Sequence, residues 1–307
     1  MIVITAPTST IGRILVNDLL ANDLLVNDLP DSGTRLRLVA RDPQRLDPEV
    51  RNHPGVEVVK GSHGDPAVID QACAGAEAVF WLAPDEPTAP SLQAAYVDFT
   101  RPACDAFARH GVQRVVAISA LGRGTSLGER AGMVTASLAM CDLIAASGVA
   151  FRAVACPSFM HNLLNHAKAI KEKNMFFMMA APDLKNPTVA TRDIAATAAR
   201  LLLDPSWNGS GQVACLGPEN LSPNDMAQII SDVLGTEVGY QQLPGAALKD
   251  RLTGFGMSDA MAQGMVDMFD AKNQGLDLAE PRTAESTTPT AFRQWCEEVL
   301  KPAVAAA

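Results

Sequence analysis

The chain begins Met1-Ile-Val-Ile-Thr-Ala-Pro-Thr-Ser-Thr-Ile-Gly-Arg-Ile-Leu15, and this stretch carries most of the information on fold class. Residues 2–5 are apolar or β-branched and predict a buried strand. A turn of small residues follows, and an apolar helix is expected to begin near Gly12. Because a helix N-terminus offers unpaired N–H groups and a partial positive charge, this strand–turn–helix order is typical of a site for a dinucleotide pyrophosphate.

The turn departs from the usual glycine pattern of such sites. Ala6 and Ser9 stand where glycines are expected, and only Gly12 remains. Hydroxyl groups of Thr8, Ser9 and Thr10 offer donors that partly replace the missing contacts to phosphate oxygens. An ordinary βα turn with Thr10 as N-cap explains the same residues, so the motif alone leaves both interpretations open.

Composition restricts the class of protein. The 307 residues suffice for a full hydrophobic core, and with 48% hydrophobic but only 5% aromatic residues that core is expected to be aliphatic. A net charge of −9 without a basic run argues against nucleic acid or an anionic membrane as the main partner. No apolar run reaches the roughly 18 residues of a membrane span. The N-terminus begins on a strand rather than a signal peptide, so we expect a cytoplasmic protein.

The cysteines and histidines do not form metal-binding patterns. Six cysteines are scattered without a C-x-x-C pair, which predicts reduced and mostly buried thiols. The five histidines show no ligand spacing. We therefore expect no metal.

Strand-like runs alternate with helical patterns through the first half of the chain. The expected strands are 2–5, 36–40, 56–59, 78–82, 112–118 and 151–155, and the expected helices are 11–29, 43–51, 66–73, 90–110 and 128–147. The dipeptide Asp65-Pro66 is typical of an N-cap followed by the first helical residue. Alternating βαβ units predict an α/β fold with a doubly wound parallel sheet, Rossmann-like, at residues 1–156.

The alternation ends near residue 156, and residues 157–307 are expected to form a smaller mixed substrate-binding cap, with 187–216 packing back on the core. The elements expected there are a helix at 157–173, an apolar cluster at 175–179, a helix at 191–203, a short strand at 212–216, a helix from a capping box at 222–225 to about Leu234, and a last helix opened by Thr288-Pro289 and ending near Leu300. In open α/β sheets, such a cap lies at the carboxyl ends of the strands, where ligands bind.

Arg41 directly follows the second strand, at the position where an acidic residue would accept from a ribose hydroxyl. An arginine at this position pairs instead with a 2′-phosphate, and Arg45 lies one turn further on. A solvated Arg41 beside an N-capping Asp42 is the simpler interpretation, and Asp42 itself is an alternative ribose ligand. The arrangement favours NADPH over NADH.

The chain lacks a Tyr-x-x-x-Lys pair, which short-chain reductases commonly use to protonate an alkoxide. Its two tyrosines, Tyr96 and Tyr240, are followed four residues later by Thr100 and Pro244. Ser119, at the end of the fifth strand, is the remaining polar candidate from such a site, although a serine there often only forms a turn.

As a set, several segments resemble the NmrA-like atypical short-chain dehydrogenase family, which includes quinone reductases, isoflavone-type reductases and redox-sensing regulators. They cover nearly the whole chain in the family's order: 5–12, 39–43, Gly64-Asp65, 78–84, 111–120, Ser147-Gly148, 157–162, 192–195 and 291–295.

The resemblance implies positions that bind the cofactor: Thr8, Ser9, Thr10, Ile11 and Gly12 for the pyrophosphate, Arg41 and Arg45 for the adenosine phosphate, Leu82, Ala83 and Pro84 for the adenosine, and Ser119, Ala120, Pro157 and Phe159 for the nicotinamide. The segment that follows suggests Phe159, Met160 and Asn162 as substrate-binding residues. Candidate catalytic residues are Ser119, Ser137 and His161.

Three departures from the family pattern bear on catalysis. Ser137 stands where the family often has Lys or His, Cys141 where it has Glu, and Cys156 where it has Arg. These changes argue against reduction of simple carbonyls by acid catalysis.

The favoured function is therefore an NADPH-dependent reductase of quinone-like or other activated small organic acceptors. Hydride addition to a simple ketone yields a strongly basic alkoxide, whereas addition to a quinone yields a phenolate-like anion with a pKa of about 10, which water can protonate. A non-catalytic dinucleotide-sensing regulatory protein and a non-redox isomerase or cyclase remain open alternatives, as do a homo-oligomer and a regulatory protein partner.

Overall fold

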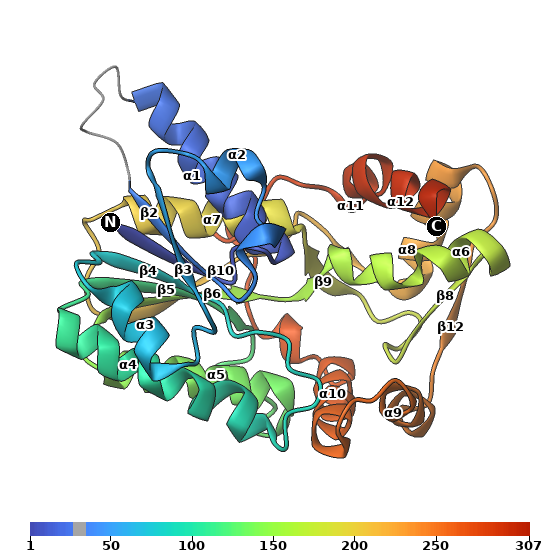
Figure 1. Ribbon diagram of the computed structural model, residues 1–307. Coiled ribbons are helices and arrows are strands. Elements are labelled where there is room, and N and C mark those ends of the chain that lie inside the picture. Colours follow the sequence, from blue (N-terminus) through green and yellow to red (C-terminus); the bar gives the residue numbers. More distant parts are fainter. Residues whose placement is uncertain (27–34) are drawn as a thin grey trace.

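The computed structural model describes residues 1–26 and 35–307. Its main layer is a seven-stranded parallel sheet with the strand order β10-β6-β5-β4-β1-β2-β3 (Figure 1). The strands are β1 (Ile2–Thr5), β2 (Leu36–Ala40), β3 (Val56–Lys60), β4 (Ala78–Trp81), β5 (Arg114–Ala120), β6 (Ala150–Cys156) and β10 (Ser210–Ala214). The chain order reverses between β1 and β4, and the carboxyl ends of the two strands at such a switch point are where open α/β sheets bind ligands. The predicted α/β class is confirmed.

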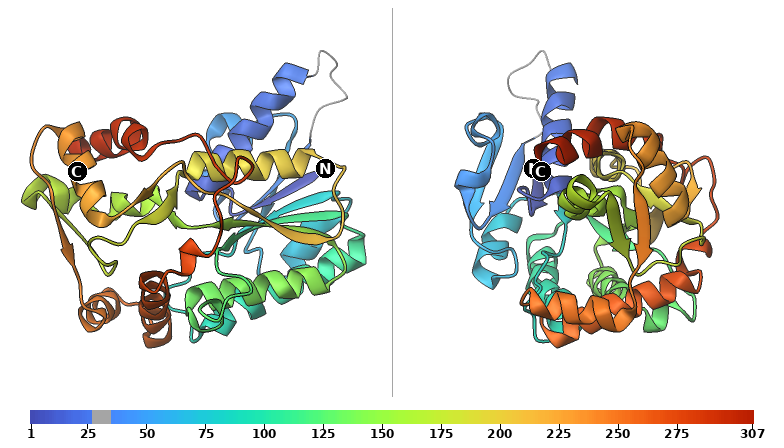
Figure 2. Two further views of the ribbon diagram at one scale, coloured as in Figure 1. Left: turned by 180° about the vertical axis from the view of Figure 1, so that it is seen from behind. Right: turned by 90° about the vertical axis from the view of Figure 1, so that its right-hand side faces the viewer.

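Helices cover both faces of this sheet. On one face lie α1 (Thr10–Val26) and α7 (Thr191–Leu203), and on the other lie α3 (Pro66–Cys73), α4 (Phe99–His110) and α5 (Met133–Ala146), as Figure 2 shows. Side chains alternate between the faces as the pleat requires: Val116 and Ile118 join the core under α1 and α7, while Val115 and Ala117 join the core under α3–α5. The helix α2 (Pro48–Arg51) is short.

The strands of the first half differ from those expected by at most two residues, but three helices are less regular. Residues 43–51 form a 3₁₀ turn (Pro43–Arg45) and α2, and a π-helical turn (Ala94–Asp98) precedes α4. The helix expected at 128–147 is a 3₁₀ turn (Gly128–Arg130) and α5, with a break at Gly132, whose φ is +53°. A Cβ at Gly132 would lie 2.1 Å from the carbonyl oxygen of Gly264, so close packing against another helix causes this break. The expected end of the first helix lies outside the described residues.

The chain after β6 builds a smaller lobe around a hydrophobic core of its own. It holds two small sheets, β11-β9-β7 and β12-β8, built from β7 (Ser158–Phe159), β8 (Met175–Met178), β9 (Asn186–Val189), β11 (Asn220–Leu221) and β12 (Gly239–Gln242). Its helices are α6 (Ala167–Lys173), α8 (Pro223–Leu234), α9 (Gly245–Gly254), α10 (Asp259–Asn273), α11 (Phe292–Trp295) and α12 (Lys301–Ala306). Its 3₁₀ turns are Met160–His166 and Leu276–Leu278, and a π-helical turn (Cys296–Leu300) joins α11 to α12.

Several expected elements and helix caps in both parts of the molecule are confirmed. The expected helix 191–203 is α7, and Ser222 and Asp225 form the predicted capping box of α8, with Ser222 Oγ accepting from Asp225 N (3.1 Å) and Asp225 Oδ2 from Ser222 N (2.9 Å). Asp65 caps α3 as predicted. The short strand expected at 212–216 is β10, at Ser210–Ala214.

Two helix predictions in this region were wrong in their boundaries. Residues 158–159 form β7 rather than the start of a helix, because they pair with Thr188 and Val189 of β9. Thr288-Pro289 does not open the last helix, because the N–H and hydroxyl of Thr288 both donate to the carbonyl oxygen of Leu216 (2.7 and 3.1 Å). The helix begins at Phe292 instead and runs, through the π-helical turn, to Ala306.

Two further properties of the chain bear on its class. All six cysteines are buried and unpaired, as expected from their spacing. Within residues 1–26 and 35–307, no helix has the length and apolar character that crossing a bilayer requires.

Candidate functional site

The turn between β1 and α1 contains few glycines, but its backbone has two features that usually require glycine. Ala6 adopts a φ of +49°, in the left-handed region that usually selects glycine. Gly12 approaches this residue so closely that a Cβ at Gly12 would lie 2.2 Å from the carbonyl oxygen of Ala6. The one retained glycine is thus the one that close packing between the turn and α1 requires.

Ser9 holds the turn together and is the N-cap of α1, in place of the expected Thr10. Its hydroxyl accepts from the N–H of Gly12 (3.0 Å) and donates to the carbonyl oxygen of Ala6 (2.8 Å), so its proton is engaged within the turn. Among the described residues, the N–H groups of Thr10 and Ile11 have no acceptor. A pyrophosphate fits this arrangement, because these two N–H groups at the start of a long helix remain to donate to its oxygens.

Arg41 extends from the end of β2 and is paired with an acidic residue. Its Nη1 lies 3.1 Å from Oε1 of Glu86, in the segment that follows β4, and both side chains are substantially exposed. Asp42 accepts from the N–H of Gln44 (3.1 Å), which is the capping role considered above for this residue. A 2′-phosphate that binds Arg41 would therefore have to displace the carboxylate of Glu86 or share the guanidinium group with it. The sequence did not reveal this contact between Arg41 and Glu86.

Arg45 lies in the 3₁₀ turn after β2, beside the turn between β1 and α1. Together with Arg13 of α1 it lines a hollow that reaches Pro7, in the turn itself. The two guanidinium groups add positive charge on the side of the turn that faces β2 and α2. Arg13 was not among the expected site residues, because a charged residue in the first turns of a surface helix usually lies in solvent.

The segment Leu82–Pro84, expected to line the adenosine, is held by two hydrogen bonds. The N–H of Leu82 donates to the hydroxyl of Thr5 (3.0 Å), and Nε2 of His63 hydrogen-bonds to the carbonyl oxygen of Leu82 (3.0 Å). His63 is 6% exposed and packs edge-on against Trp81 and Phe99. Burial lowers the pKa of His63 from 6.5 to about 4, so the imidazole is neutral near physiological pH. Sequence reasoning missed His63, which has no local pattern.

Ser119, Ser137 and Cys141 come together where β5 meets α5. Ser119 is 6% exposed, and its hydroxyl has no hydrogen-bond partner among the described residues. It lies beside the thiol of Cys141, whose pKa burial raises to about 11, an effect that the Ser119 hydroxyl partly offsets. Ser137 is also buried and shares a face of α5 with Cys141, four residues later. These side chains bring neutral groups to this part of the fold.

The two tyrosines do not supply the missing acid. The hydroxyl of Tyr240 hydrogen-bonds to the carbonyl oxygens of Met178 (2.9 Å) and Ala180 (2.5 Å) in the smaller lobe, and burial raises its pKa. Burial also raises the pKa of Tyr96. Both phenols are therefore weaker acids than free tyrosine.

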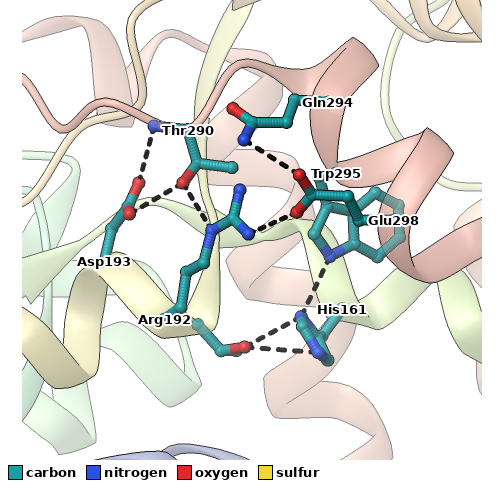
Figure 3. Close-up of polar contacts among 8 residues, drawn as sticks. His161, Arg192, Asp193, Thr290, Gln294, Trp295 and Glu298 are labelled. Carbon is teal, nitrogen blue, oxygen red and sulfur yellow. Dashed lines mark hydrogen bonds and ion pairs between the residues drawn. The ribbon is translucent and has the colours of Figure 1, made fainter. Parts of the chain in front are cut away.

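His161 belongs to a polar network between the smaller lobe and α7, drawn in Figure 3. The indole N–H of Trp295 donates to Nδ1 of His161 (3.2 Å), and the hydroxyl of Thr191 lies 2.9 Å from the same nitrogen. An acceptor role for Nδ1 requires the neutral tautomer, and burial lowers the pKa of His161 in agreement with it. These contacts engage His161 with α7 and α11, away from the group around Ser119.

The rest of this network fixes α7 to the last helical segment. Asp193 accepts from both the N–H (3.0 Å) and the hydroxyl (2.8 Å) of Thr290, and Arg192 donates to the same hydroxyl (2.8 Å) and pairs with Glu298 (Figure 3). The segment 192–195, one of those that carry the family resemblance, therefore has a structural explanation.

The residues expected to bind substrate divide between core and surface. Met160 is 2% exposed and packs in the core of the smaller lobe, together with Phe176 of the apolar cluster 175–179. Phe159 packs partly against the core under α1 and α7, and Asn162 is exposed. Phe176 and Met179 of the cluster are buried and the other three residues are partly buried, so the cluster mainly fills the core of the smaller lobe.

Cys156 ends β6 and is also buried. Its thiol lies beside that of Cys215, which directly follows the neighbouring strand β10. Burial raises the pKa of Cys156 well above its usual range. A neutral thiol therefore occupies the position at which an arginine was expected from the family resemblance.

Comparisons with known proteins bear on this site. The NmrA-like family profile matches residues 1–296. An NAD(P)H azoreductase of Xenophilus azovorans is 27% identical over 277 residues, which cover 88% of this chain and 86% of that protein. A (4-alkanoyl-5-oxo-2,5-dihydrofuran-3-yl)methyl phosphate reductase of Streptomyces griseus is 28% identical over 302 residues, 97% of each protein.

A solved structure shows the same fold over the whole chain. An NADPH-dependent quinone oxidoreductase of Escherichia coli, crystallised with NADPH, matches with a TM-score of 0.73 and 21% identity, covering 100% of this chain and 99% of that one.

Proposed function

The chain belongs to the NmrA-like family, and from this premise we propose that it is an NADPH-dependent reductase of quinone-like or other activated small organic acceptors. The observation that carries the proposal is the pairing of two features at one sheet edge. The β1–α1 turn offers free N–H groups and the close approach at Gly12, while β5 ends in a buried, unpartnered Ser119 hydroxyl beside neutral α5 residues.

In this proposal the cofactor is held by residues of the β1–α1 turn, of the end of β2 and of the segment after β4. The N–H groups of Thr10 and Ile11 bind the pyrophosphate, and Arg41 and Arg45 bind the 2′-phosphate. The backbone of Leu82–Pro84, fixed by Thr5 and His63, lines the adenosine. A bound nicotinamide supplies a hydride at the carboxyl ends of β5 and β6, next to Ser119, Ala120 and Pro157–Phe159.

The acceptor end restricts the substrate class. Ser119, Ser137 and Cys141 are weak acids, and burial raises the pKa of the thiol further. A ketone needs a proton in the transition state, whereas a quinone or another conjugated acceptor spreads the incoming charge before it is protonated. In this proposal, catalysis depends on positioning the two reactants, and Ser119 contributes a hydrogen bond to the acceptor.

The relatives support this direction, since one is an NAD(P)H azoreductase and another reduces an oxo-dihydrofuran phosphate. Neither name is that of a simple ketone reductase. The non-catalytic sensor and the isomerase or cyclase remain as outcomes of the test.

The test combines cofactor titration with an acceptor panel. We expect the purified protein to bind NADPH more tightly than NADH, and to oxidise NADPH with benzoquinones and azo compounds but not with unactivated ketones. Efficient ketone turnover with inert quinones would contradict the proposed mechanism. Tight NADPH binding without turnover of any acceptor would favour the sensor, and no binding of either dinucleotide would remove the proposal.

A further inference from the structure

Lys272 and Asp277 form a buried ion pair in the smaller lobe. Lys272 Nζ lies 2.5 Å from Oδ2 of Asp277, and their side chains are 8% and 1% exposed. Lys272 lies in the last turn of α10, and Asp277 lies in the 3₁₀ turn that follows. In every other ion pair among the described residues, at least one side chain is more than a third exposed. This pair is therefore exceptional in its environment.

Packing places the pair at the carboxyl ends of β5 and β6. Leu276 lies against Gly122, just after β5, so closely that a Cβ on Gly122 would meet its Cδ1 at 2.4 Å. Ala271 packs with Ala131 and Val134, in a cluster that Ala120 joins. The positive charge of Lys272 also acts on the Cys156 thiol at the end of β6, whose pKa it lowers against the larger effect of burial. Ligands of open α/β sheets bind at this edge.

Structural stability alone explains the pair poorly. Removing two charges from water costs as much as their attraction returns, and an apolar pair of similar volume is often as stable. The second carboxylate oxygen of Asp277, Oδ1, is buried without a hydrogen-bond partner among the described residues, as is the hydroxyl of Ser119. The free oxygen of Asp277 can only accept a hydrogen bond and is no site for an anion. The buried ammonium and the unpartnered Ser119 hydroxyl are both donors, and a ligand that accepts hydrogen bonds at this edge of the sheet explains them better than packing does.

We propose that Lys272, oriented by Asp277, stabilises the negative charge that develops on the acceptor. The inference rests on the proposed function. The acceptor gains a hydride, that is one hydrogen nucleus and two electrons, from the reduced dinucleotide, and becomes an oxygen or nitrogen anion. The ammonium of Lys272 donates a proton to that anion, which completes the two-electron reduction, and the amine regains a proton from water. Asp277 keeps the side chain in place throughout.

The inference also defines the charge of the preferred substrate. The pair as a whole is neutral, but in this proposal the ammonium lies nearer to the acceptor than the carboxylate does. It therefore favours acceptors that are neutral or anionic and become more negative on reduction, such as quinones, conjugated lactones and sulfonated azo compounds. The same charge disfavours cationic acceptors of similar size. In this arrangement α10 supplies the proton that a Tyr–Lys pair supplies in other short-chain reductases.

The first test measures binding rather than turnover. 4-Nitrophenol changes colour when it ionises, and it serves as a probe of the anion that reduction produces. We expect the wild-type protein loaded with NADP⁺ to bind it as phenolate at a pH where the free phenol is mostly protonated, in competition with a quinone. The double variant Lys272→Met/Asp277→Leu replaces both charges by apolar side chains, an exchange that buried ion pairs often tolerate, and it should lose this preference for phenolate.

The second test separates the chemical step from cofactor binding. In Lys272→Met/Asp277→Leu we expect kcat with quinones to fall at least tenfold, the Kd of NADPH to remain unchanged, and the preference for anionic over cationic acceptors to disappear. Lys272→Arg, which retains the charge, should recover part of the activity. The matched control is Lys249→Met/Asp259→Leu, which removes an exposed pair (Nζ to Oδ1, 2.8 Å) between α9 and α10. We expect it to behave as wild type.

The outcomes distinguish the inference from the proposed function. Failure of the wild type to bind 4-nitrophenol as phenolate, or equal phenolate binding and kcat in the Lys272→Met/Asp277→Leu variant, would overturn the inference while NADPH binding and quinone turnover stand. Loss of phenolate binding in this variant supports Lys272 as an anion-binding group even where no acceptor is reduced, and in that case only the proposed reaction fails.

Discussion

The candidate site has a cofactor end, at the turn between β1 and α1, and an acceptor end, where β5 meets α5. Each end departs from the family pattern in a different way. At the cofactor end, Ala6 and Ser9 replace glycines, yet the turn retains a left-handed residue, a close approach at Gly12 and free helix N–H groups. At the acceptor end, Ser137 and Cys141 keep their places on α5 but bring neutral groups where the family resemblance predicts ionisable ones.

The difference follows from what each end requires. Pyrophosphate binding depends on backbone N–H groups and a helix dipole, which survive side-chain changes as long as the turn keeps its conformation. Acid catalysis depends on a particular side chain with a suitable pKa, so a substitution removes it altogether. On this reasoning we expect the cofactor end to tolerate substitution, whereas an acid or a charge at the acceptor end has to come from another element, as proposed for Lys272.

The largest expected effect comes from Gly12→Ala, which disturbs the backbone of the turn between β1 and α1. In Gly12→Ala, the new Cβ must displace the Ala6 carbonyl, from which it would lie 2.2 Å away. Such overpacking costs about 1–3 kcal/mol of stability, and we expect NADPH binding to weaken at least tenfold. Chemical denaturation and NADPH titration measure the two effects. Gly254→Ala, with open space around the new methyl group, is the control and should leave both unchanged or improve stability slightly. Equal behaviour of the two variants would show that the turn adapts.

Acid should lower the unfolding free energy of the protein through His63, which hydrogen-bonds to Leu82. Its pKa is lowered from 6.5 to about 4 by burial, so the folded protein binds this proton less readily than the unfolded chain. The stabilisation is complete above pH 6.5 and is lost as the pH falls toward 4, by about 3 kcal/mol at 1.36 kcal/mol per pKa unit.

The check compares the pH dependence of the unfolding free energy in wild type and His63→Gln. We expect the variant to be less stable at neutral pH but to lose less stability between pH 6.5 and 4. Parallel curves for the two proteins would show that His63 does not carry this effect. His161, whose imidazole is only half-buried, should contribute a smaller effect from the other region.

Arg41 and Glu86 test side-chain recognition at the cofactor end. A charge-assisted contact to the 2′-phosphate contributes about 1.5–3 kcal/mol, so Arg41→Ala should weaken NADPH binding about tenfold or more and leave NADH binding unchanged. Glu86→Gln should act in the opposite direction, because the 2′-phosphate no longer competes with a carboxylate 3.1 Å from Arg41. Paired titrations of NADPH and NADH measure both.

The control for this pair is Glu57→Gln. It removes a carboxylate on β3 that pairs with Arg37 on β2, and neither residue belongs to the proposed cofactor site. It should leave the ratio of the two affinities as in wild type. If Arg41→Ala weakened NADH and NADPH equally, Arg41 would have a general structural role and the cofactor preference would have another origin.

The smallest expected effect concerns backbone strain in the turn. A non-glycine residue in the left-handed region costs about 1–2 kcal/mol, and Ala6→Gly relieves this strain while adding about 0.4–1 kcal/mol of unfolded-state entropy. We expect a net gain in stability of about 0.5 kcal/mol. Asn174→Gly in the smaller lobe, at a φ of +50°, is the matched variant and should gain less, because asparagine tolerates this conformation better than alanine. A larger gain at Asn174 would reverse the comparison.

Local sequence signals predicted the first half of the fold well. Strands β1–β6 and the caps of α3 and α8 follow from alternating apolar runs and from Asp or Ser before proline, because these signals act within a few residues. The same reasoning failed at Thr288-Pro289, where the hydroxyl and N–H donate to Leu216, 72 residues away. A cap motif is therefore informative only when no distant acceptor competes for it.

The sequence by itself determined the parallel sheet, the position of the turn between β1 and α1 and the absence of a Tyr-x-x-x-Lys pair, since each depends on neighbouring residues. Tertiary structure alone decided that Ser9 uses its hydroxyl within the turn, that Glu86 pairs with Arg41, that His161 is engaged by Trp295, and that Lys272 and Asp277 are buried at the strand ends. The physical reason is that burial and pairing of a charge depend on which elements pack together, and contacts between residues distant in sequence leave no pattern in either local segment.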